Sequence, residues 1–337
     1  MTDLVFFTSP IGLGHATRDA AISHHLDGVS KKFVTGAGAF KLLAEYGFDA
    51  EDLYVPPPFR VENGKLQKPL RWLLTYLSYY KETKRISSQV VGKERPRLVA
   101  SDEDFGSLVS AQKRGVKTVL VTDILETSFA SGIGAVVEKV MNRGMKDIIS
   151  KCDLVIVPET GKSQGNIARV GPIVRESSQS RERLREKYSF GRKTVVVSTG
   201  GTDLGRFLIE EAVRVFQRGK IDADLVVVSG PSLQVENLPF RNLGFAPNMH
   251  EVICAADVIV SLAGKSTIDE SVHFGTPGIF IPIKGHFEQE ENARDVGFSH
   301  EDLFRLEELV LKKMEEKMDP KPFAGAKAAA DMIRELL

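Results

Sequence analysis

Short runs of apolar, often β-branched residues alternate with segments of helical periodicity along the whole chain. Such runs include LVFFT (4–8), RLVAS (97–101), KTVVVS (193–198) and DVIVSL (257–262). Continuous apolar strands separated by helices are typical of parallel sheets that are covered on both faces. The pattern therefore predicts an α/β protein built on doubly wound parallel sheets.

Two parts of this pattern resemble each other. The segment 101–123 and the segment 261–283 each contain a strand end, a helix, a glycine (Gly115 or Gly275) and the next strand. This repetition predicts two similar domains, each with its ligand edge at the carboxyl ends of its strands. The polar, turn-rich segment 171–180 is the best boundary between them. We expect an N-terminal acceptor-binding domain at 1–174, a C-terminal donor-binding domain at 175–321, and a terminal helix at 322–337 that packs back on the first domain.

Composition and charge narrow the class of protein. The chain has 337 residues, 42% of them hydrophobic, with 45 Lys and Arg against 45 Asp and Glu. A neutral balance gives no reason to expect nucleic acid as a partner. Cys152 and Cys254 fit no metal or disulfide spacing, which favours reduced thiols in the cytoplasm. No signal peptide and no apolar run long enough to span a membrane are recognisable.

The most informative segment is 242–293. Its strand AADVIVSL ends at Ala263-Gly264, and a helix follows at once, with Ser266 or Thr267 placed to cap it and Glu270 one turn further on. Free backbone N–H groups and the helix dipole at such a helix start favour a phosphate. A carboxylate beside that phosphate suits a sugar diol. The combination predicts a nucleotide site, and more narrowly a nucleotide-sugar site.

The sequence Gly264-Lys265-Ser266-Thr267 imitates the end of a Walker A loop. The earlier glycine that such a loop requires would stand where Ile259 lies, within the strand. A Walker loop is therefore excluded. Lys265 could still meet a diphosphate as a point charge, or it could be an ordinary solvated lysine.

Two further loops follow predicted strands. STGGTDLGR (198–206) would offer backbone N–H groups to a phosphate, although a plain turn between strand and helix is the alternative. KGHFEQEENA (284–293) could hydrogen-bond sugar hydroxyls, or be an exposed acidic loop. The candidate residues in these loops are Thr199, Gly200, Gly201, His286, Glu288, Gln289 and Asn292.

The loop TSPIGLGHATRD, after the first strand, carries the candidate base. Gly12 and Gly14 permit a tight turn and a close backbone approach to the donor, and His15 stands at the start of the following helix. His15 is either a general base or a turn residue that only satisfies backbone groups. Asp102 or Asp104, after the strand RLVA, could orient it, as a third group does in a catalytic triad. Alternatively, these acids only mark a solvated helix start.

The segment 56–85 is rich in aromatic residues and scattered Lys and Arg, and it holds the only tryptophan, Trp72. A peripheral helix at a lipid interface has this mix. An ordinary core helix with a basic outer face is the alternative.

Taken together, these residues resemble the GT-B glycosyltransferases, in particular the MurG-like and UDP-glucuronosyltransferase-like group, with an uncharacterised archaeal branch as nearest kin. The resemblance covers the layout of the whole chain and is specific over 244–293. It implies that His15 is the base, that the backbone near Phe245 reads uracil, and that Glu270 binds the ribose diol. It also implies that Gly264, Ser266 and Thr267 hold the diphosphate, and that Gln289 and Asn292 meet the sugar or phosphates. Pro10-Ile11 stand where the peptidoglycan enzyme is Gly-rich, so its acceptor cannot be carried over.

The resemblance predicts an inverting transferase that moves N-acetylglucosamine or a hexose from a UDP-sugar to an acceptor hydroxyl. No acidic pair suited to a metal lies in the donor half, so we expect neither a metal nor another cofactor. The acceptor is unknown, with a lipid-linked one suggested by 56–85, which would place the protein peripherally on the inner face of the cell membrane. A monomer or a homodimer fits. The alternatives are a UDP-sugar epimerase on the same fold and a non-catalytic nucleotide-sugar-binding subunit.

Overall fold

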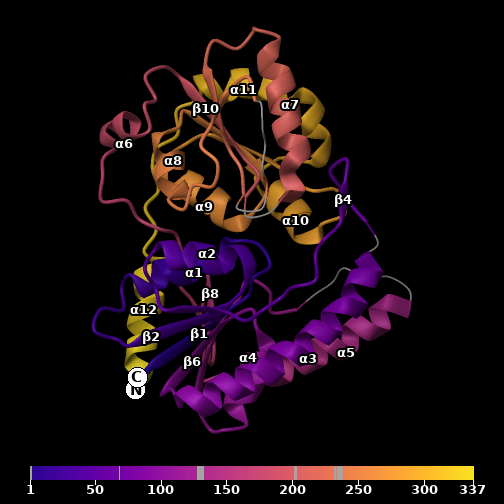
Figure 1. Cartoon of the computed structure of the whole chain (residues 1–337), viewed down its shortest axis with the longest axis vertical. Coiled ribbons are helices and arrows are strands. Elements are labelled where there is room, and N and C mark those ends of the chain that lie inside the picture. Colours follow the sequence, from indigo (N-terminus) through magenta and orange to yellow (C-terminus); the bar gives the residue numbers. More distant parts are fainter. Residues whose placement is uncertain (1, 68, 127–132, 201–202, 231–232, 234–237) are drawn as a thin grey trace.

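Two parallel β-sheets, each covered by helices, form the two halves of the molecule (Figure 1). The computed structural model describes residues 2–67, 69–126, 133–200, 203–230, 233 and 238–337. Within these residues the first sheet has seven strands in the order β3-β2-β1-β6-β7-β8-β9, and the second has five in the order β12-β11-β10-β13-β14. The predicted fold class is confirmed.

The strands of the first sheet are β1 (Leu4–Thr8), β2 (Lys31–Thr35), β3 (Ala50–Asp52), β6 (Leu98–Asp102), β7 (Lys117–Val121), β8 (Leu154–Val157) and β9 (Ile167–Arg169). Those of the second are β10 (Thr194–Ser198), β11 (Asp224–Val228), β12 (Arg241–Asn242), β13 (Val258–Leu262) and β14 (Gly278–Ile281). A short antiparallel pair consists of β4 (Val61–Glu62) and β5 (Lys65–Leu66).

The helices of the first half are α1 (Gly14–Ser23), α2 (Ala37–Glu45), α3 (Pro69–Glu94), α4 (Phe105–Gln112) and α5 (Ile133–Ser150). They are followed by α6 (Arg181–Lys187), η1 (Asp203–Gly205), α7 (Arg206–Gln217), α8 (Met249–Ala255), α9 (Lys265–Phe274), α10 (Phe287–Asp295), η2 (His300–Arg305), α11 (Leu306–Glu315) and α12 (Gly325–Leu336). Among the described helices, none is both long enough and apolar enough to cross a membrane.

Alternation along β1 shows why its sheet is covered on both sides. Leu4 and Phe6 belong to the apolar cluster under α1 and α2, whereas Val5 and Phe7 belong to the cluster under α3 and α4. Every residue of β1 is buried. A strand that must face apolar side chains on both sides becomes the continuous apolar run seen in the sequence.

The last helix of the chain packs on the first half, although the second half precedes it. Ala326, Ala329 and Ile333 of α12 lie in the same cluster as Leu4 of β1, and Figure 1 shows α12 in yellow beside α1 and β2. At Gly325 an added Cβ would lie 2.4 Å from the carbonyl oxygen of Pro172, so only glycine fits this crossing. The domain limits drawn at 174 and 321 stay predictions.

Candidate active site

His15 lies where the first sheet meets the second half. The loop after β1 turns at Gly12, whose φ of 81° suits glycine, and α1 then begins at Gly14, one residue before His15. An added Cβ at Gly14 would lie only 3.1 Å from Oγ of Ser266 at the start of α9. The predicted loop with the candidate base therefore directly faces the predicted phosphate-binding helix start.

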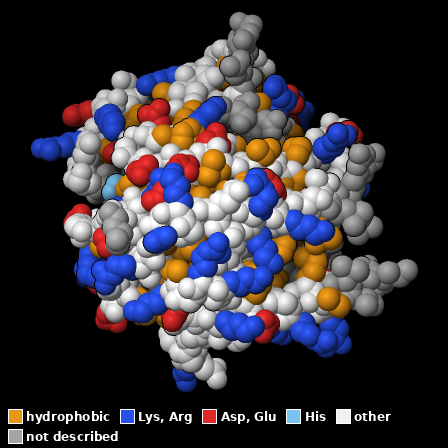
Figure 2. All heavy atoms as spheres, turned by 60° about the horizontal axis from the view of Figure 1, so that its bottom comes forward, with side chains coloured by type: hydrophobic (Ala, Val, Ile, Leu, Met, Phe, Trp, Pro, Cys, Tyr) orange, Lys and Arg blue, Asp and Glu red, His pale blue; other side chains and the backbone are white. Residues whose placement is uncertain are grey.

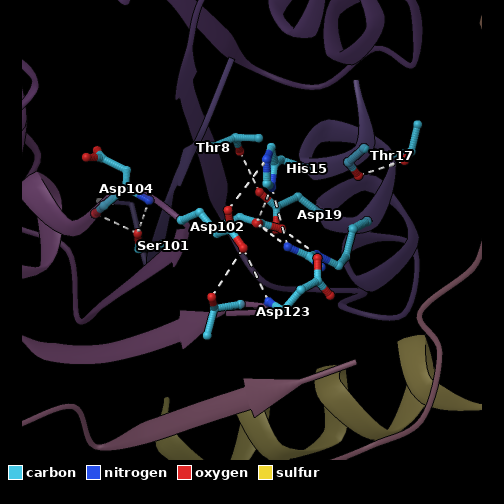
Figure 3. A network of polar contacts seen from close by, with 12 residues as sticks. Thr8, His15, Thr17, Asp19, Ser101, Asp102, Asp104 and Asp123 are labelled. Atoms are coloured by element: carbon cyan, nitrogen blue, oxygen red, sulfur yellow. Dashed lines mark hydrogen bonds and ion pairs between the residues drawn. The ribbon is translucent and has the colours of Figure 1, made fainter. Parts of the chain in front are cut away.

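Asp102 is the acid that contacts His15. It is the last residue of β6, pairs in register with Thr8 of β1, and is completely buried. Nδ1 of His15 lies 2.8 Å from Oδ1 of Asp102, as Figure 3 shows. The carboxyl ends of two neighbouring parallel strands meet at one edge, and this brings residues far apart in sequence into contact.

Arg18 binds the same carboxylate. Its Nε donates to Oδ2 of Asp102 at 2.8 Å and its Nη2 to Oδ1 at 2.6 Å, and its Nη1 donates to Asp123 at 2.7 Å. This two-pronged pair is the strong geometry between arginine and carboxylate. Burial would raise the pKa of Asp102, but the charges of Arg18 and His15 outweigh it and lower that pKa. Asp102 therefore stays ionised, and its negative charge lies beside the ring of His15.

The same surroundings favour the protonated form of His15. Burial would lower its pKa, but the charge of Asp102, its hydrogen bond and the charge of Glu103 raise the pKa to about 9. Asp19, whose Oδ2 accepts a hydrogen bond from Thr8, behaves in the opposite way. Burial and the nearby charge of Asp102 raise the pKa of Asp19 well above its usual range, so it is a neutral acid beside the pair.

Asp104 does not take the role that the sequence left open to it. Its Oδ1 accepts the backbone N–H of Gly106 at 3.0 Å and caps α4, and its Oδ2 accepts the hydroxyl of Tyr54 at 2.6 Å. In the described part of the chain its carboxylate has no contact with His15. The prediction that Asp104 could assist His15 is corrected: Asp104 stabilises a helix start, and Asp102 holds the base.

Glu103, between these two acids, was not among the predicted site residues. Its backbone has φ of 56°, in the left-handed region that side chains other than glycine rarely adopt. Its Oε1 accepts from Oγ1 of Thr122 and from the backbone N–H of Asp123, both at 3.2 Å. Its Oε2 lies 3.8 Å from Nε2 of His15.

The start of α9 differs from the prediction in one respect. Gly264 is the residue before the helix, and neither Ser266 nor Thr267 caps it, because both already lie within its first turn. The first backbone N–H groups of a helix have no partner within it, so an anion could still bind there. Nζ of Lys265 lies 2.5 Å from both carboxylate oxygens of Asp269, and its side chain is partly exposed. This lysine is therefore ion-paired, and its contact with a diphosphate stays a prediction.

Glu270 forms a buried ion pair that the sequence did not suggest. Nε of Arg175 donates to its Oε1 at 2.8 Å and Nη2 to its Oε2 at 3.2 Å. Nη1 of the same arginine donates to the hydroxyl of Tyr46 at 2.6 Å and to the carbonyl of Pro247 at 2.8 Å. Tyr46 follows α2 in the first half, whereas Glu270 and Pro247 belong to the second. Arg175 therefore links Glu270, the predicted diol-binding residue of the second half, to Tyr46 of the first half.

Several other predicted donor residues hold the loops in place. Thr199 accepts the N–H of Gly230 at 3.1 Å, and Gly200, with φ of 68°, donates to Oγ of Ser198 at 3.2 Å. Gly201 lies outside the described residues. Phe245, from the second half, packs on the apolar cluster of the first.

The loop after β14 is similarly braced. The ring of His286 accepts the N–H of Gln289 at 3.5 Å at the start of α10. Oε1 of Gln289 accepts the N–H of Ile283 at 3.1 Å, and Asn292 donates to the carbonyl of Ala263 at 3.2 Å. The Asn292 contact fixes the turn between β13 and α9. Binding roles for these side chains stay predictions.

Glu288, in the same loop, extends toward the base from the opposite half. Burial and the charge of Glu103 raise the pKa of Glu288 to about 7, and the charge of His15 opposes that rise. The polar loop was expected to contact a sugar. Its position adds one more carboxylate to the group around His15.

The sequence contains a signal for two of the missed residues, Arg18 and Asp123. Arg18 stands three residues after His15, so both lie on one face of α1. Asp123 lies two residues after the end of β7, the strand that follows β6 in the chain, which places it at the same sheet edge as Asp102. Arg175 and Glu103 carried no such signal, because both positions depend on loop geometry.

Comparison with known proteins finds a matching family domain and similar sequences. Residues 194–334 match the Glycosyltransferase family 28 C-terminal domain. An uncharacterized glycosyltransferase from Methanopyrus kandleri is 26% identical over 220 residues, which are 62% of this chain and 63% of that protein. The alignment therefore spans somewhat less than two thirds of that relative.

A second relative has a named activity. The UDP-N-acetylglucosamine--N-acetylmuramyl-(pentapeptide) pyrophosphoryl-undecaprenol N-acetylglucosamine transferase of Aquifex aeolicus is 26% identical over 209 residues, 58% of this chain and 59% of that protein. Among solved structures, the glycotransferase of kitacinnamycin has the same fold, with a TM-score of 0.63 and 14% identity over 100% of this chain and 99% of that one.

Proposed function

Because this chain belongs to the GT-B glycosyltransferases of the MurG-like group, we propose that it moves N-acetylglucosamine or a hexose from a UDP-sugar to an acceptor hydroxyl. The observation that carries this proposal is the His15–Asp102 pair, 2.8 Å apart, in the loop that faces the start of α9. A base and an anion-binding helix start on facing halves are the two parts that sugar transfer from a nucleotide needs.

The proposed reaction proceeds with inversion and without a metal. The acceptor O–H gives its proton to Nε2 of His15 while its oxygen forms a bond to the anomeric carbon. The bond from that carbon to the diphosphate oxygen breaks, and UDP leaves with the electron pair. Asp102, bound to Nδ1, fixes the ring and stabilises the imidazolium that forms. The backbone N–H group of Ser266, in the first turn of α9, would stabilise the charge that develops on the diphosphate.

Donor recognition would use the second half. Glu270 is proposed to accept the two ribose hydroxyls, and the backbone near Phe245 to read the uracil. In the donor-free structure Glu270 already accepts two hydrogen bonds from Arg175. A carboxylate has about four acceptor positions, so two remain for the hydroxyls of a diol. Because Glu270 is only 3% exposed, a diol would reach it only if the groups that cover it moved.

The proposed partner on the acceptor side is a lipid surface. The face brought forward in Figure 2, at the lower end of the molecule, carries more Lys and Arg than Asp and Glu side chains. Basic residues of α3 and of the turns before β6 and β7 are exposed, namely Lys81, Arg85, Lys93, Arg95, Arg97, Lys113, Arg114 and Lys117. Such a face attracts anionic lipid headgroups. It lies at the amino ends of β6 and β7, whereas His15 and Asp102 lie at the carboxyl ends, so it would hold the protein on a membrane without itself presenting the acceptor to His15.

The aromatic residues of 56–85 have a different role from the one expected of a lipid anchor. Trp72 stacks on Phe59 at 4.4 Å and on Tyr76 at 5.2 Å between ring centroids, and its indole N–H donates to the carbonyl of Pro57. These rings pack on one another, and Phe59 also lies 5.6 Å from the ring of His286 in the second half. The proposed lipid contact therefore rests on charge more than on Trp72.

The test of the proposed function is the variant His15→Ala, with His25→Ala as a matched control. UDP release from UDP-N-acetylglucosamine and from UDP-glucose, with water as acceptor, should fall by about 10²- to 10⁴-fold in His15→Ala alone. Calorimetry should show unchanged UDP binding in both variants. Wild-type turnover by His15→Ala would refute the base, and interconversion of the donor sugars without UDP release, followed by NMR, would favour an epimerase.

A further inference from the structure

Glu103 has an unusual position for a charged residue. It follows β6 directly, and its backbone is held in the left-handed region by a bridge to Thr8 and by its N–H bond to the carbonyl of Val121. This conformation is unfavourable for a side chain other than glycine, Asn or Asp. Neighbouring residues maintain this strained backbone at the carboxyl end of a central strand. The strained backbone sets the direction in which the side chain of Glu103 points.

That side chain is fixed and directed at His15. Thr122 and the N–H of Asp123 both bind Oε1, which leaves Oε2 as the oxygen that faces the imidazole. Oε2 lies 3.8 Å from Nε2, on the ring nitrogen opposite the one that Asp102 binds. The imidazole thus lies between two carboxylates, one for each nitrogen.

Other titratable groups around His15 also affect its protonation. They are Arg18 and the neutral Asp19 on α1, Asp102 on β6, Asp123 after β7, Glu288 on α10 and the Lys265–Asp269 ion pair on α9. Arg18 is committed to Asp102 and Asp123. Glu103 is therefore the acid that stands at the reactive side of the ring.

We propose that Glu103 is a positioning residue that controls when His15 can act as a base: its carboxylate stabilises the protonated ring by its charge in the acceptor-free protein, and the acceptor hydroxyl takes the place next to Nε2 when it binds. The inference rests on the proposed function. Before each turnover the Nε2 proton passes to water, and the empty nitrogen then takes the acceptor proton as the new C–O bond forms. The rise in the pKa of His15, to which Glu103 contributes, fits this arrangement.

Direct titration of His15 tests the proposal without any enzymatic assay. The ring proton of His15, identified by its loss in His15→Ala, is followed by NMR against pH in the donor-free protein. In Glu103→Gln the pKa of His15 should fall by about one unit or more, because a charge about 4 Å away is removed. Glu103→Asn, which tolerates the left-handed backbone and cannot reach the ring, should give the same direction of change.

The matched control is Glu126→Gln, whose carboxylate is exposed and pairs with Lys146. It should leave the His15 titration unchanged. If the pKa of His15 were the same in Glu103→Gln, Glu103→Asn and the control, the proposal would be overturned, whether or not the chain transfers sugar. A shifted titration combined with full activity of His15→Ala would instead refute the base and leave the Glu103 contact standing.

The pH dependence of kcat/KM distinguishes a positioning role of Glu103 from direct contact of Glu103 with the acceptor. If Glu103 acts through His15, the ascending limb of kcat/KM against pH should move to lower pH in Glu103→Gln, so that UDP release at pH 7 rises by up to about tenfold. The plateau at high pH should be unchanged. An unmoved limb with a uniform loss at every pH would show that Glu103 contacts the acceptor and would overturn the positioning role.

Discussion

Each half of the molecule contributes to a buried arginine–carboxylate pair, and the two pairs differ in what surrounds them. Arg18 and Asp102 lie in the first half, and Arg175 and Glu270 lie where the chain enters the second. Both arginines are 6% exposed. The first pair contacts an imidazole and further acids, whereas the second contacts a phenol hydroxyl and a backbone carbonyl among the residues that the structure describes.

The difference shows how one motif can serve two purposes. Burying an ion pair is costly and is only partly repaid by mutual attraction, so each pair needs further contacts. At Asp102 the extra contact is a titratable ring, and the pair stabilises its charged form. At Glu270 the extra contacts come from both halves, and the pair fixes a position. The first pair therefore affects the protonation of His15, and the second fixes the position of Glu270 relative to both halves.

The largest effect that would sharpen this comparison is expected from Asp102→Asn. Loss of the carboxylate removes the group that sets the tautomer of His15, so kcat should fall by about 10³-fold or more, while UDP affinity stays unchanged. UDP release and calorimetry measure the two quantities. The control is Asp104→Asn, which alters the contacts of this side chain with Tyr54 and Gly106 and should leave kcat unchanged. Equal losses of kcat in both variants would break the distinction between the two acids.

The second pair should respond in stability. In Arg175→Met the carboxylate of Glu270 is left buried without its partner, and we expect the free energy of unfolding to fall by about 3–5 kcal/mol. The double variant Arg175→Met with Glu270→Leu should recover much of that loss, yet bind UDP more weakly than the wild type. Urea denaturation and calorimetry give the two readings. A single variant as stable as wild type would show that the pair does not hold the halves together.

The smallest expected effect is a pH dependence that only the first pair should show. Because the pKa of His15 is raised to about 9, the stabilisation is complete below the unfolded value of about 6.5 and is lost as pH rises through about 9. The stability of wild type relative to His15→Asn should thus decline by about 3 kcal/mol between pH 6 and pH 10. Urea denaturation of both proteins at several pH values measures this difference. A difference that stays flat between these pH values would contradict the raised pKa.

The fold was largely predictable, and the site only in part. Apolar runs identified the central strands because residues such as Phe6 and Val5 must face opposite apolar layers. The same reasoning placed His15 and the start of α9 at strand ends. It could not choose between Asp102 and Asp104, because that choice depends on where β6 ends against Thr8.

The errors have similar causes. Ser266 and Thr267 were expected to cap α9, but the helix begins earlier, since Gly264 already has the extended backbone of a cap position. Lys265 was left between two readings because its partner Asp269 is a turn away on the same helix. Arg175 lies in a segment without periodicity, and only the three-dimensional arrangement shows that it reaches Tyr46 and Glu270.

The return of α12 to the first half has a mechanical consequence. The chain enters the second half near Pro172 and leaves it just before Gly325, and these two segments touch. The hairpin of β4 and β5 is a separate link, because Leu66 donates to the carbonyl of Lys284 and packs with Val61 on the apolar cluster of the second half. The halves are therefore tied at two separate places, and both links constrain any change in their relative position.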